Sequence, residues 1–455
     1  MGGGDQTVID DNDISGNPIL SITTNANTAA YFRLAGITFE GGSGSVKWQG
    51  MVSVAGNSAN VRLDHSHFNT TTYSRAASGT GVQFTGCVYG VVDHSIFDNP
   101  SGSVNNSIHD NNSGACFKDS LGFGDQSWAH STSLGSAGFL FAENNIFNSG
   151  IGNDCTFGGR FVFRFNTFNM TMPAPSLQTH PTGGAGRIRG CRAWEIYQNH
   201  FSAAAGSYIN AGFWVSSGTG VVWGNTIPSS SAGGGTGYKT FILLNSMRKN
   251  NVTYPQAPTP HGWGYCGTAY KGAGSNWDQN SNATTGYRCM DQPGQGQGDL
   301  LTGGFTSDDS GTNNVKNATT RCNSSSACAW VAEALEPVYE WADNYSPVPS
   351  NPSKLLGINP YFGTGAFFDN SDYYTWCNPA STTGCTSFTG TSGVGSGTLA
   401  SRPSTCTTGV AYWAKDQGSW NHSGSGGQGE LFVCTITNTW MLYYTPYVYP
   451  HPLDD

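Results

Sequence analysis

One short pattern recurs through the first half of the chain and constrains its fold more than any other feature. Each copy is an alternating run of apolar and polar residues, then a small polar residue, one further residue, and Phe or Ile. The positions that close the copies are Phe39, Phe68, Phe97, Phe147, Phe168, Phe201 and Ile227. Successive gaps between them are 29, 29, 50, 21, 33 and 26 residues. A unit of this length cannot bury its apolar face alone, so the copies are expected to stack.

The residue two places before each closing position is polar, and this column predicts how the copies stack. Its members are Ser66, Ser95, Asn145, Asn166, Asn199 and Asn225. Stacked coils pair their backbones ~4.8 Å apart and align equivalent residues. We therefore expect Asn side chains to hydrogen-bond along the axis and Phe rings to stack in the core. The sequence predicts an all-β fold, a right-handed parallel β-helix with long loops and a small C-terminal β element. A propeller would repeat every ~40–50 residues, and a β-sandwich would not keep one register.

Composition decides between this fold and a disordered chain. Charged residues make up 11% of the sequence and there are 63 glycines, values that a disordered chain could also have. The 13 Trp, 20 Tyr and 24 Phe are too many for a solvated coil. The net charge of −9, without a run of Lys or Arg, argues against a nucleic-acid partner. No stretch reaches about 18 apolar residues, so no membrane span is expected.

The twelve cysteines point to disulfide bonds and an oxidising compartment. Their spacing matches no zinc pattern, and eight of them follow residue 260, where regular patterning fades. Proximity suggests four pairs, although the connectivity stays open: Cys266–Cys289, Cys322–Cys328, Cys377–Cys385 and Cys406–Cys434. We expect a secreted, extracellular protein. No signal sequence is present in this chain, and Met1 is interpreted as the start of a fragment.

Patterning divides the chain into three parts. Residues 1–250 hold the parallel β-helix coils, and residues 251–397 form a loop-rich, disulfide-stapled region packed on them. Residues 398–455 are predicted to form a β cap over the open end of the solenoid. The tryptophans of that cap offer an alternative, carbohydrate binding, through Trp413, Trp420 and Trp440.

The repeat over residues 30–250 resembles the right-handed parallel β-helix proteins of the pectate-lyase-like superfamily. The ending Tyr444-Thr445-Pro446-Tyr447, with Tyr449-Pro450-His451-Pro452-Leu453, is similar to the close of bacterial and environmental β-helix proteins of unassigned activity. The resemblance implies that a polysaccharide binds along the first sheet and the turns that overhang it. The Lys–Arg and triple-Asp patterns usual in that superfamily are not evident here as recognisable motifs.

Candidate catalytic residues follow from outward positions on that first sheet. With Cys155 and Trp214 taken as inward, Asp154 is outward and neighbours Arg187 on the adjoining coil. The predicted catalytic residues are Asp154, His180, Arg187 and Arg189. Arginine would neutralise the carboxylate of an acidic sugar, while His180 or an arginine would take the C5 proton. The alternative is a cross-strand ion pair without a catalytic role.

The insertion 98–131 is expected to overhang the same face and to carry Asp125 and Trp128 as substrate-binding residues. Asp125 and Asp154 could hold a Ca²⁺ that bridges to the sugar. In a hydrolase those two carboxylates would instead act as acid and base, and their separation would predict inversion or retention.

A second outward stripe offers further substrate-binding residues on neighbouring coils. The predicted members are Glu143, Arg164, Glu195, Tyr197 and Trp223. The aromatic members could stack against sugar faces, and the charged pair could bridge adjoining coils. The alternative is a decorated face turned to solvent.

These observations favour an extracellular polysaccharide-active enzyme, with β-elimination slightly preferred over glycoside hydrolysis. The alternative is a non-catalytic protein that binds a glycan or a surface, as adhesins and tailspikes do, or a structural β-helix. A lyase would form an unsaturated product, a hydrolase would form reducing ends only, and a binding protein would form neither. The sequence does not name the glycan and leaves the oligomeric state open.

Overall fold

The structure is a computed structural model of the whole chain. The residues that it describes are 7–10, 17–24, 31–41, 49–71, 79–99, 106–112, 127–128, 130–171, 175–180, 190–205, 208–228, 237–246, 277–278, 287–288, 292–296, 333–346, 356–360, 366–376, 388–423 and 428–454.

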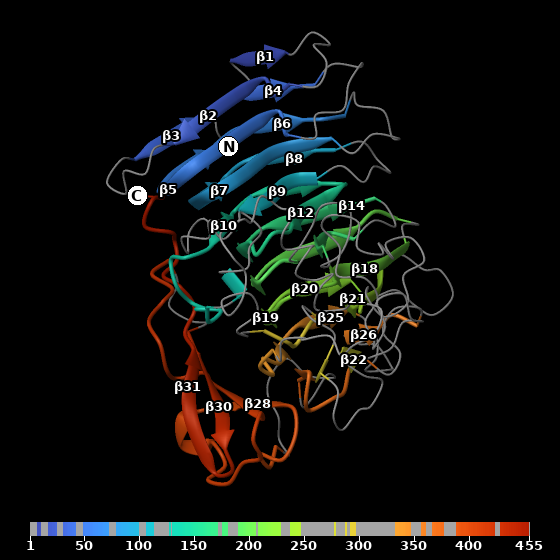
Figure 1. Cartoon of the computed structure of the whole chain (residues 1–455), viewed down its shortest axis with the longest axis vertical. Helices are drawn as coiled ribbons and strands as arrows, with labels where there is room; N and C mark the ends of the chain where they lie inside the picture. Colours follow the sequence, from blue (N-terminus) through green and yellow to red (C-terminus); the bar gives the residue numbers. More distant parts are fainter. Residues whose placement is uncertain are drawn as a thin grey trace, which may run out of the picture.

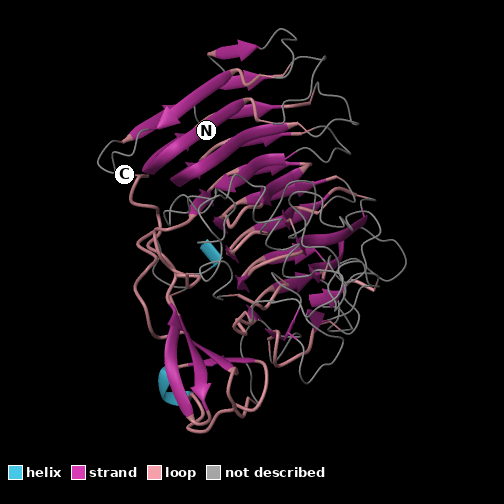
Figure 2. Cartoon of the chain, in the orientation of Figure 1, coloured by secondary structure: helices cyan, strands magenta, loops and turns pink. Residues whose placement is uncertain are grey.

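Short parallel strands stack into a solenoid with three walls, as Figures 1 and 2 show. The first wall contains β2 (Leu20–Thr24), the first halves of β5 (Val52–Asp64) and β7 (Thr80–Asp93), β9 (Asn106–Asn112), β12 (Ile151–Cys155), β15 (Leu177–Thr179), β18 (Tyr208–Val215), β21 (Gly237–Leu244) and β26 (Leu356–Ile358). The second wall contains β3 (Phe32–Ala35), the second halves of β5 and β7, β10 (Leu140–Glu143), β13 (Arg160–Arg164), β16 (Ala193–Tyr197), β19 (Thr219–Trp223), β24 (Val338–Trp341) and β27 (Tyr373–Tyr374).

The third wall is a separate nine-stranded sheet. It contains β1 (Val8–Asp10), β4 (Thr38–Glu40), β6 (His67–Asn69), β8 (Ile96–Asp98), β11 (Ile146–Asn148), β14 (Thr167–Met170), β17 (His200–Ala203), β20 (Thr226–Pro228) and β25 (Asn344–Ser346). The first and second walls form one 16-stranded sheet because β5 and β7 run through both. The predicted parallel β-helix is confirmed.

The corner between the second and third walls has two residues in coil after coil. The first residue has a left-handed backbone, with φ of 48° at His65, 57° at Phe165 and 66° at Gly224. The second residue belongs to the predicted polar column. Because the left-handed residue turns the chain sharply, the strand that follows enters the third wall after only two residues.

The polar column forms a continuous hydrogen-bonded ladder, as predicted. The backbone N of Asn145 donates to Oδ1 of Asn166 at 3.0 Å, and Asn166 donates in the same way to Asn199 at 3.0 Å. Inside the third wall, Phe rings stack with centroids 4.5 to 5.4 Å apart through Phe39, Phe68, Phe97, Phe147, Phe168 and Phe201. Both columns tie each coil to the next, so they hold the walls in register.

The coils continue beyond the predicted boundary at residue 250. Strands β24 and β25 add a coil next to β19 and β20, and β26 extends the first wall beside β21. A long insertion therefore separates two coils that are neighbours in space. The predicted division between residues 1–250 and 251–397 is wrong in this respect, since strands from both parts share the same sheets. The described part of the insertion includes an antiparallel pair, β22 (Trp277–Asp278) and β23 (Tyr287–Arg288).

The C-terminal part forms the four-stranded sheet β28 (Val394–Gly397), β29 (Ala411–Ala414), β30 (Glu430–Ile436) and β31 (Thr439–Tyr444), with the short 3-10 helix η4 (Leu399–Ser401). Its apolar side packs against the outer face of the second wall, where Trp413 and Trp420 contact Trp223. These two tryptophans are buried, so they do not offer a carbohydrate-binding surface. The third, Trp440, is partly buried beside Tyr412.

Two disulfide bonds join described cysteines. Cys406–Cys434 matches the pairing suggested by proximity, whereas Cys155–Cys191 was not expected. The other three suggested pairs, Cys266–Cys289, Cys322–Cys328 and Cys377–Cys385, lie outside the described residues. Within the part of the chain that the structure describes, no helix is long and apolar enough to cross a membrane.

Candidate functional site on the first wall

A row of functional side chains follows the outer face of the first wall. Strand register aligns Gln83, His109, Asp154, Gln178 and Trp214 on five consecutive strands. Asp154 is 3% exposed, and the other four are partly exposed. Neighbouring strands lie ~4.8 Å apart, so the row presents one polar or aromatic group per coil along the axis.

The centre of this row is a hydrogen-bonded pair between Asp154 and His180. Nδ1 of His180, in the residue after β15, contacts Oδ1 of Asp154. The second carboxylate oxygen, Oδ2, accepts a hydrogen bond from Nδ2 of Asn106 at 3.3 Å. The His180 side chain is 22% exposed and that of Asp154 is 5% exposed. The imidazole is therefore the member of the pair that solvent reaches.

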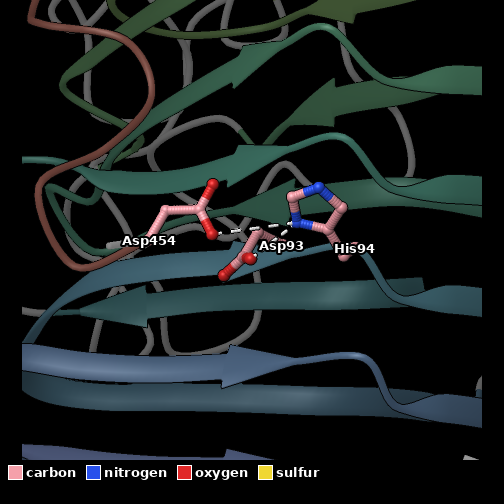
Figure 3. Close-up of side chains that lie close together, drawn as sticks. All are labelled: Asp93, His94 and Asp454. Carbon is pink, nitrogen blue, oxygen red and sulfur yellow. Dashed lines mark hydrogen bonds and ion pairs between the residues drawn. The ribbon is translucent and has the colours of Figure 1, made fainter. Parts of the chain in front are cut away.

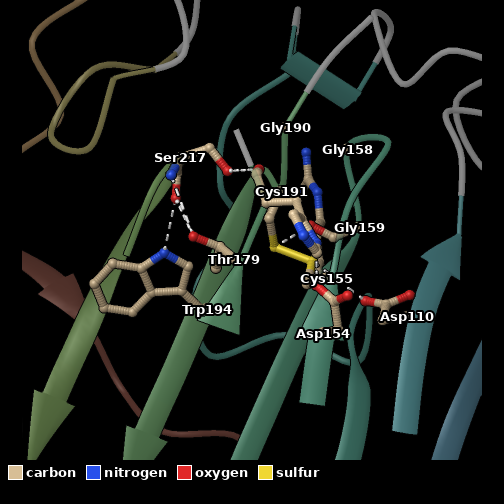
Figure 4. The surroundings of a disulfide bond; sticks show 12 residues. Asp110, Asp154, Cys155, Gly158, Gly159, Thr179, Gly190, Cys191, Trp194 and Ser217 are labelled. Atoms are coloured by element: carbon tan, nitrogen blue, oxygen red, sulfur yellow. Dashed lines mark hydrogen bonds and ion pairs between the residues drawn. A yellow bond between two sulfur atoms is a disulfide. The ribbon is translucent and has the colours of Figure 1, made fainter. Parts of the chain in front are cut away.

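The Cys155–Cys191 disulfide lies beside Asp154, as Figure 4 shows, and it helps to hold the pair in place. It ties the end of β12 to the segment that enters β16, with Cα atoms 5.3 Å apart. The backbone N of His180 donates to the Cys155 carbonyl at 2.9 Å, and Oγ of Ser217 donates to the His180 carbonyl at 2.7 Å. Both backbone polar groups of His180 are thus fixed from neighbouring coils, which orients its ring.

A carboxylate bound to Nδ1 gives the histidine a defined chemical role. When Asp154 accepts the Nδ1 proton, the neutral imidazole carries its lone pair on Nε2. Nε2 is then the atom that can take a proton from a bound molecule, and the carboxylate stabilises the imidazolium that forms. Such an arrangement can act as a general base with its orienting group.

The neighbours of Asp154 differ from those that the sequence suggested. They are His109 on β9 and Gln178 on β15. The strand next to Asp154 therefore comes from residues 177–179, ahead of the stretch that holds Arg187. The assignment of Trp214 as inward is also wrong, because Phe213 and Val215 fill the core beside it. Alternation alone gave no signal for residues 177–179, where the strand has only three residues.

The other residues predicted for this face have different outcomes. Asp125, Arg187 and Arg189 lie outside the described residues. Trp128 is fully buried, its Nε1 donates to the Gly190 carbonyl at 3.0 Å, and the Arg192 guanidinium lies 5.2 Å from its ring. Trp128 therefore supports the corner between the walls, and its predicted role in contacting substrate is wrong.

The described residues of the first wall do not by themselves make a calcium site. Asp154 is their only outward carboxylate, since Asp110 shares an inward column with Phe84 and Cys155. Both oxygens of Asp154 already accept hydrogen bonds. Calcium takes six to eight oxygen ligands. No chemical step is therefore assigned to a metal.

The side chains of the second stripe are buried. On the second wall, equivalent outward positions carry Asp93, Glu143, Arg164, Tyr197 and Trp223. All five are at most 2% exposed. Trp413 and Trp420 cover Tyr197 and Trp223. The last segment of the chain, Tyr444–Asp454, here named the C-terminal strap, covers Glu143 and Arg164. It crosses from one coil to the next along the wall (Figure 1).

The C-terminal strap is bound through charged groups of the second wall. The guanidinium of Arg164 donates to the carbonyls of Tyr447 at 2.7 Å and Val448 at 2.8 Å, and it pairs with Glu143 at 2.6 Å. The other Glu143 oxygen accepts the backbone N of His451 at 2.8 Å. Each charge is therefore paired and hydrogen-bonded, as burial requires.

Glu195 lies at the start of the strap. Its carboxyl accepts hydrogen bonds from the backbone N of Gly135 at 2.7 Å and from the hydroxyl of Tyr444 at 2.8 Å. Burial raises the pKa of Glu195 to about 7, and these two hydrogen bonds oppose the rise. Glu195 belongs to the packing of the strap against the wall.

The prediction that Glu143, Arg164, Glu195, Tyr197 and Trp223 contact substrate is wrong, and so is the alternative of a solvent-exposed face. These side chains do point outward from the coils. However, the aromatic pair, with ring centroids 4.7 Å apart, packs against Trp420 instead of a sugar.

The strap ends in a cluster of Asp93, His94 and Asp454, shown in Figure 3. One ligand atom from each lies within 4.8 Å of the others. The guanidinium of Arg62 already binds both carboxylates, at 2.8 Å from Oδ2 of Asp93 and through a direct ion pair with Asp454. Arg62 supplies the positive charge that a metal would bring, so the cluster serves to anchor the strap.

Comparisons of the chain with protein-family models, with curated proteins and with solved structures found no match. The interpretation of the site therefore depends on its own geometry.

Proposed function

We propose that the protein binds an acidic polysaccharide along the first wall and cleaves it by β-elimination, with His180 as the base. The observation that carries the proposal is the Asp154–His180 pair on an outward row, with the imidazole 22% exposed. Asp154 orients the ring and stabilises its protonated form. Arg187 and Arg189 remain the predicted partners of the sugar carboxylate.

The rest of the row supports an elongated ligand. Gln178 lies on the strand next to Asp154, and Trp214 lies on the strand after that. Amide groups hydrogen-bond sugar hydroxyls, and a partly exposed indole offers a face on which a sugar ring can stack. Because coils are ~4.8 Å apart, Trp214 would bind the polymer about 10 Å from the reacting sugar.

The chemistry of the pair favours elimination over hydrolysis. A hydrolase needs two carboxyl groups on opposite sides of the scissile bond. Among the described residues of the first wall, only Asp154 provides an outward carboxylate, and it is bound to an imidazole. Elimination needs one base that removes the C5 proton, and His180 can supply it through Nε2. The proton then resides on the imidazolium, and the C4–O bond breaks as the C4–C5 double bond forms. The departing sugar oxygen takes a proton from water, and the imidazolium neutralises the resulting hydroxide, which restores the base.

The test is incubation with a panel of uronic and neutral polysaccharides, read by ultraviolet absorbance of the unsaturated product and by reducing ends. Replacing His180 by Ala should lower kcat by about 10²- to 10⁴-fold, the usual contribution of a general base. Asp154→Asn should also lower kcat, because the amide no longer favours the required tautomer. The matched control is His200→Ala, an exposed histidine on β17 of the third wall.

Three results would contradict this proposal. Reducing ends without an unsaturated product would indicate a hydrolase. Full activity in the His180 variant would remove the base from its assigned role. Retardation of a polysaccharide in an affinity gel, without any product, would favour the alternative of a non-catalytic binding protein.

One observation supports that alternative. On the third wall, outward side chains form an exposed polar ladder in which Asn148 donates to Asp98 at 2.6 Å and Asn169 donates to Asn148 at 2.9 Å. Ser202 extends it by donating to Asn169 at 2.9 Å. A regular row of amides can bind hydroxyl groups without chemistry. In a binding protein, Asn148→Ala and Asn169→Ala would weaken retardation more than His180→Ala.

The proposed activity implies a location and a wider relationship. Disulfide bonds persist in oxidising compartments, so Cys155–Cys191 and Cys406–Cys434 support the proposal of a secreted, extracellular protein. The three parallel walls and the polar ladder support a relationship to the pectate-lyase-like superfamily.

A further inference from the structure

The polar ladder between the second and third walls ends on a carboxyl group. From Asn145 to Asn225 each member is asparagine, and the next member is Asp343, between β24 and β25. Oδ1 of Asp343 accepts the backbone N of Asn225 at 2.7 Å and its Nδ2 at 2.9 Å. Asp343 thus replaces asparagine as the acceptor for the coil before it.

An asparagine in this ladder also acts as a donor. Its Nδ2 binds the carbonyl located three residues before the preceding ladder member. The observed pairs are Asn145 with Val92 at 2.8 Å, Asn166 with Ala142 at 2.9 Å, Asn199 with Phe163 at 2.8 Å and Asn225 with Ile196 at 3.1 Å.

Asp343 can act as this donor only when it is protonated. The ladder member before Asp343 is Asn225, so an asparagine at position 343 would donate its Nδ2 to the carbonyl of Val222. Oδ2 of Asp343 takes the place of that Nδ2. Oδ2 is buried and accepts no hydrogen bond from the described residues when the group is treated as a carboxylate, and the side chain of Asp343 also contacts the carboxyl group of Glu340. An ionised carboxyl has no proton to donate, whereas the neutral acid does.

A second carboxyl group shares this interior. Glu340 on β24 aligns with Val222, whose side chain is in the core, and Glu340 is 1% exposed. Its Oε2 accepts the backbone N of Trp376 at 3.1 Å. The Tyr345 hydroxyl of β25 is buried beside the two acids. Burial raises the pKa of both carboxyl groups, and the charge of Glu340 raises that of Asp343 further.

We propose that Asp343 and Glu340 retain at least one proton between them at neutral pH, and that this proton closes the coil formed by β24 and β25. That coil follows the long insertion 245–337, so its strands return to the sheets only after a large break in the chain. The protonated acid supplies the donor that asparagine supplies elsewhere. Loss of the proton leaves two like charges in the core beside Tyr345 and Asn225, and it favours opening of β24 and β25.

The test is the pH dependence of unfolding by urea. Because an unfolded chain releases these protons near pH 4 to 5, the unfolding constant should rise as the pH increases, by about tenfold per pH unit for each retained proton. Asp343→Asn supplies the donor without a titrating group. It should lower the number of protons released on unfolding by about one and preserve the fold at neutral pH.

The control is Glu195→Gln, which removes the buried carboxyl beneath the C-terminal strap. Because Glu195 lies outside the polar ladder, its effect should add to that of Asp343→Asn. If the Asp343 variant does not fold, infrared spectra of the Glu195→Gln protein provide the second measurement. They should show a protonated carboxyl band at pH 7.

Three results would overturn the inference. The first is an unchanged proton release in Asp343→Asn, and the second is a spectrum without the protonated band. The third is a fall in the unfolding midpoint of the unaltered protein when EDTA is added at pH 7, because the carboxyl groups would then be holding a cation.

Discussion

The outer rows of the first and second walls arise from the same strand geometry but differ in their exposure to solvent. Both consist of side chains that alternate outward from short parallel strands. On the first wall, Gln178 and Trp214 remain partly exposed beside the Asp154–His180 pair. On the second wall, the equivalent row is buried beneath the C-terminal strap and sheet. An outward position can therefore serve as a binding surface only where no later part of the chain covers it.

The largest expected effect concerns the charge that holds the strap. Arg164→Ala should lower the free energy of unfolding by about 4 kcal/mol, because it leaves Glu143 buried without its partner. The control is Arg33→Ala, whose side chain is 46% exposed and whose buried partner Asp64 also pairs with Arg62 and His65. Loss of Arg33 should cost less than loss of Arg164, because Asp64 keeps two other partners. Equal unfolding midpoints in urea for the two variants would show that the strap adds little stability.

Replacing one tryptophan on each wall compares the two rows directly. Trp223→Ala should lower the free energy of unfolding by about 3 kcal/mol, since the indole packs between Tyr197 and Trp341 in a closed interior. Trp214→Ala should cost less, and it should instead weaken polysaccharide binding. Thermal unfolding and affinity gels measure the two effects. If Trp214→Ala reduces stability as much as Trp223→Ala, the first wall is also covered.

The smallest expected effect is a pH dependence that only the covered wall contributes. The pKa of Glu195 is about 7 in the folded protein and about 4.3 when unfolded. Between these values the unfolded chain releases a proton that the folded chain keeps, so stability falls as the pH rises and is constant above about pH 7. Glu195→Gln should remove this loss, measured by urea unfolding at several pH values. In contrast, a variant with an unchanged pH profile would mean that Glu195 ionises freely.

Another buried group of the strap acts in the opposite direction. Burial and the nearby positive charge of Arg164 lower the pKa of His451 to about 3, below its usual value near 6.5. The unfolded chain binds a proton here that the folded chain does not, so stability rises as the pH increases from about 3 to about 6.5. Above pH 6.5 this contribution is complete. The effect of Glu195 is therefore clearest in the upper part of its range.

The fold was predictable because its signals are local and repeated. Each coil carries its own closing Phe or Ile and its own polar residue, and stacking follows from their alignment. The missed coil had the same signal, since Trp341-Ala342-Asp343-Asn344-Tyr345 has the pattern of Trp223-Gly224-Asn225-Thr226-Ile227. The long insertion hid this match, because no strand pattern linked residue 244 to residue 338.

The site was predictable only in part. The structure brings Asp154 and His180 together, as predicted. However, the sequence analysis assigned the strand beside Asp154 to the residues around Arg187, whereas residues 177–179 form it. The covering of the second wall could not be found from sequence, because contacts such as that between Arg164 and Val448 link residues far apart in the chain. Such contacts produce no repeating pattern in the sequence. The sequence around an outward Trp is also the same whether sugar, solvent or protein covers the side chain.

The two-residue corner has a consequence for how such a molecule can change. Between the first and second walls the connection ranges from residues 216–218 to residues 245–337. An added residue at Asn144–Asn145 would turn the side chains of the following strand to the opposite face. It would also break the hydrogen bonds of Asn145 with Ser95 and Asn166. The corner between the second and third walls therefore has a fixed length, and length variation is confined to the other connections between walls. New recognition loops can be grafted there without disturbing the stack.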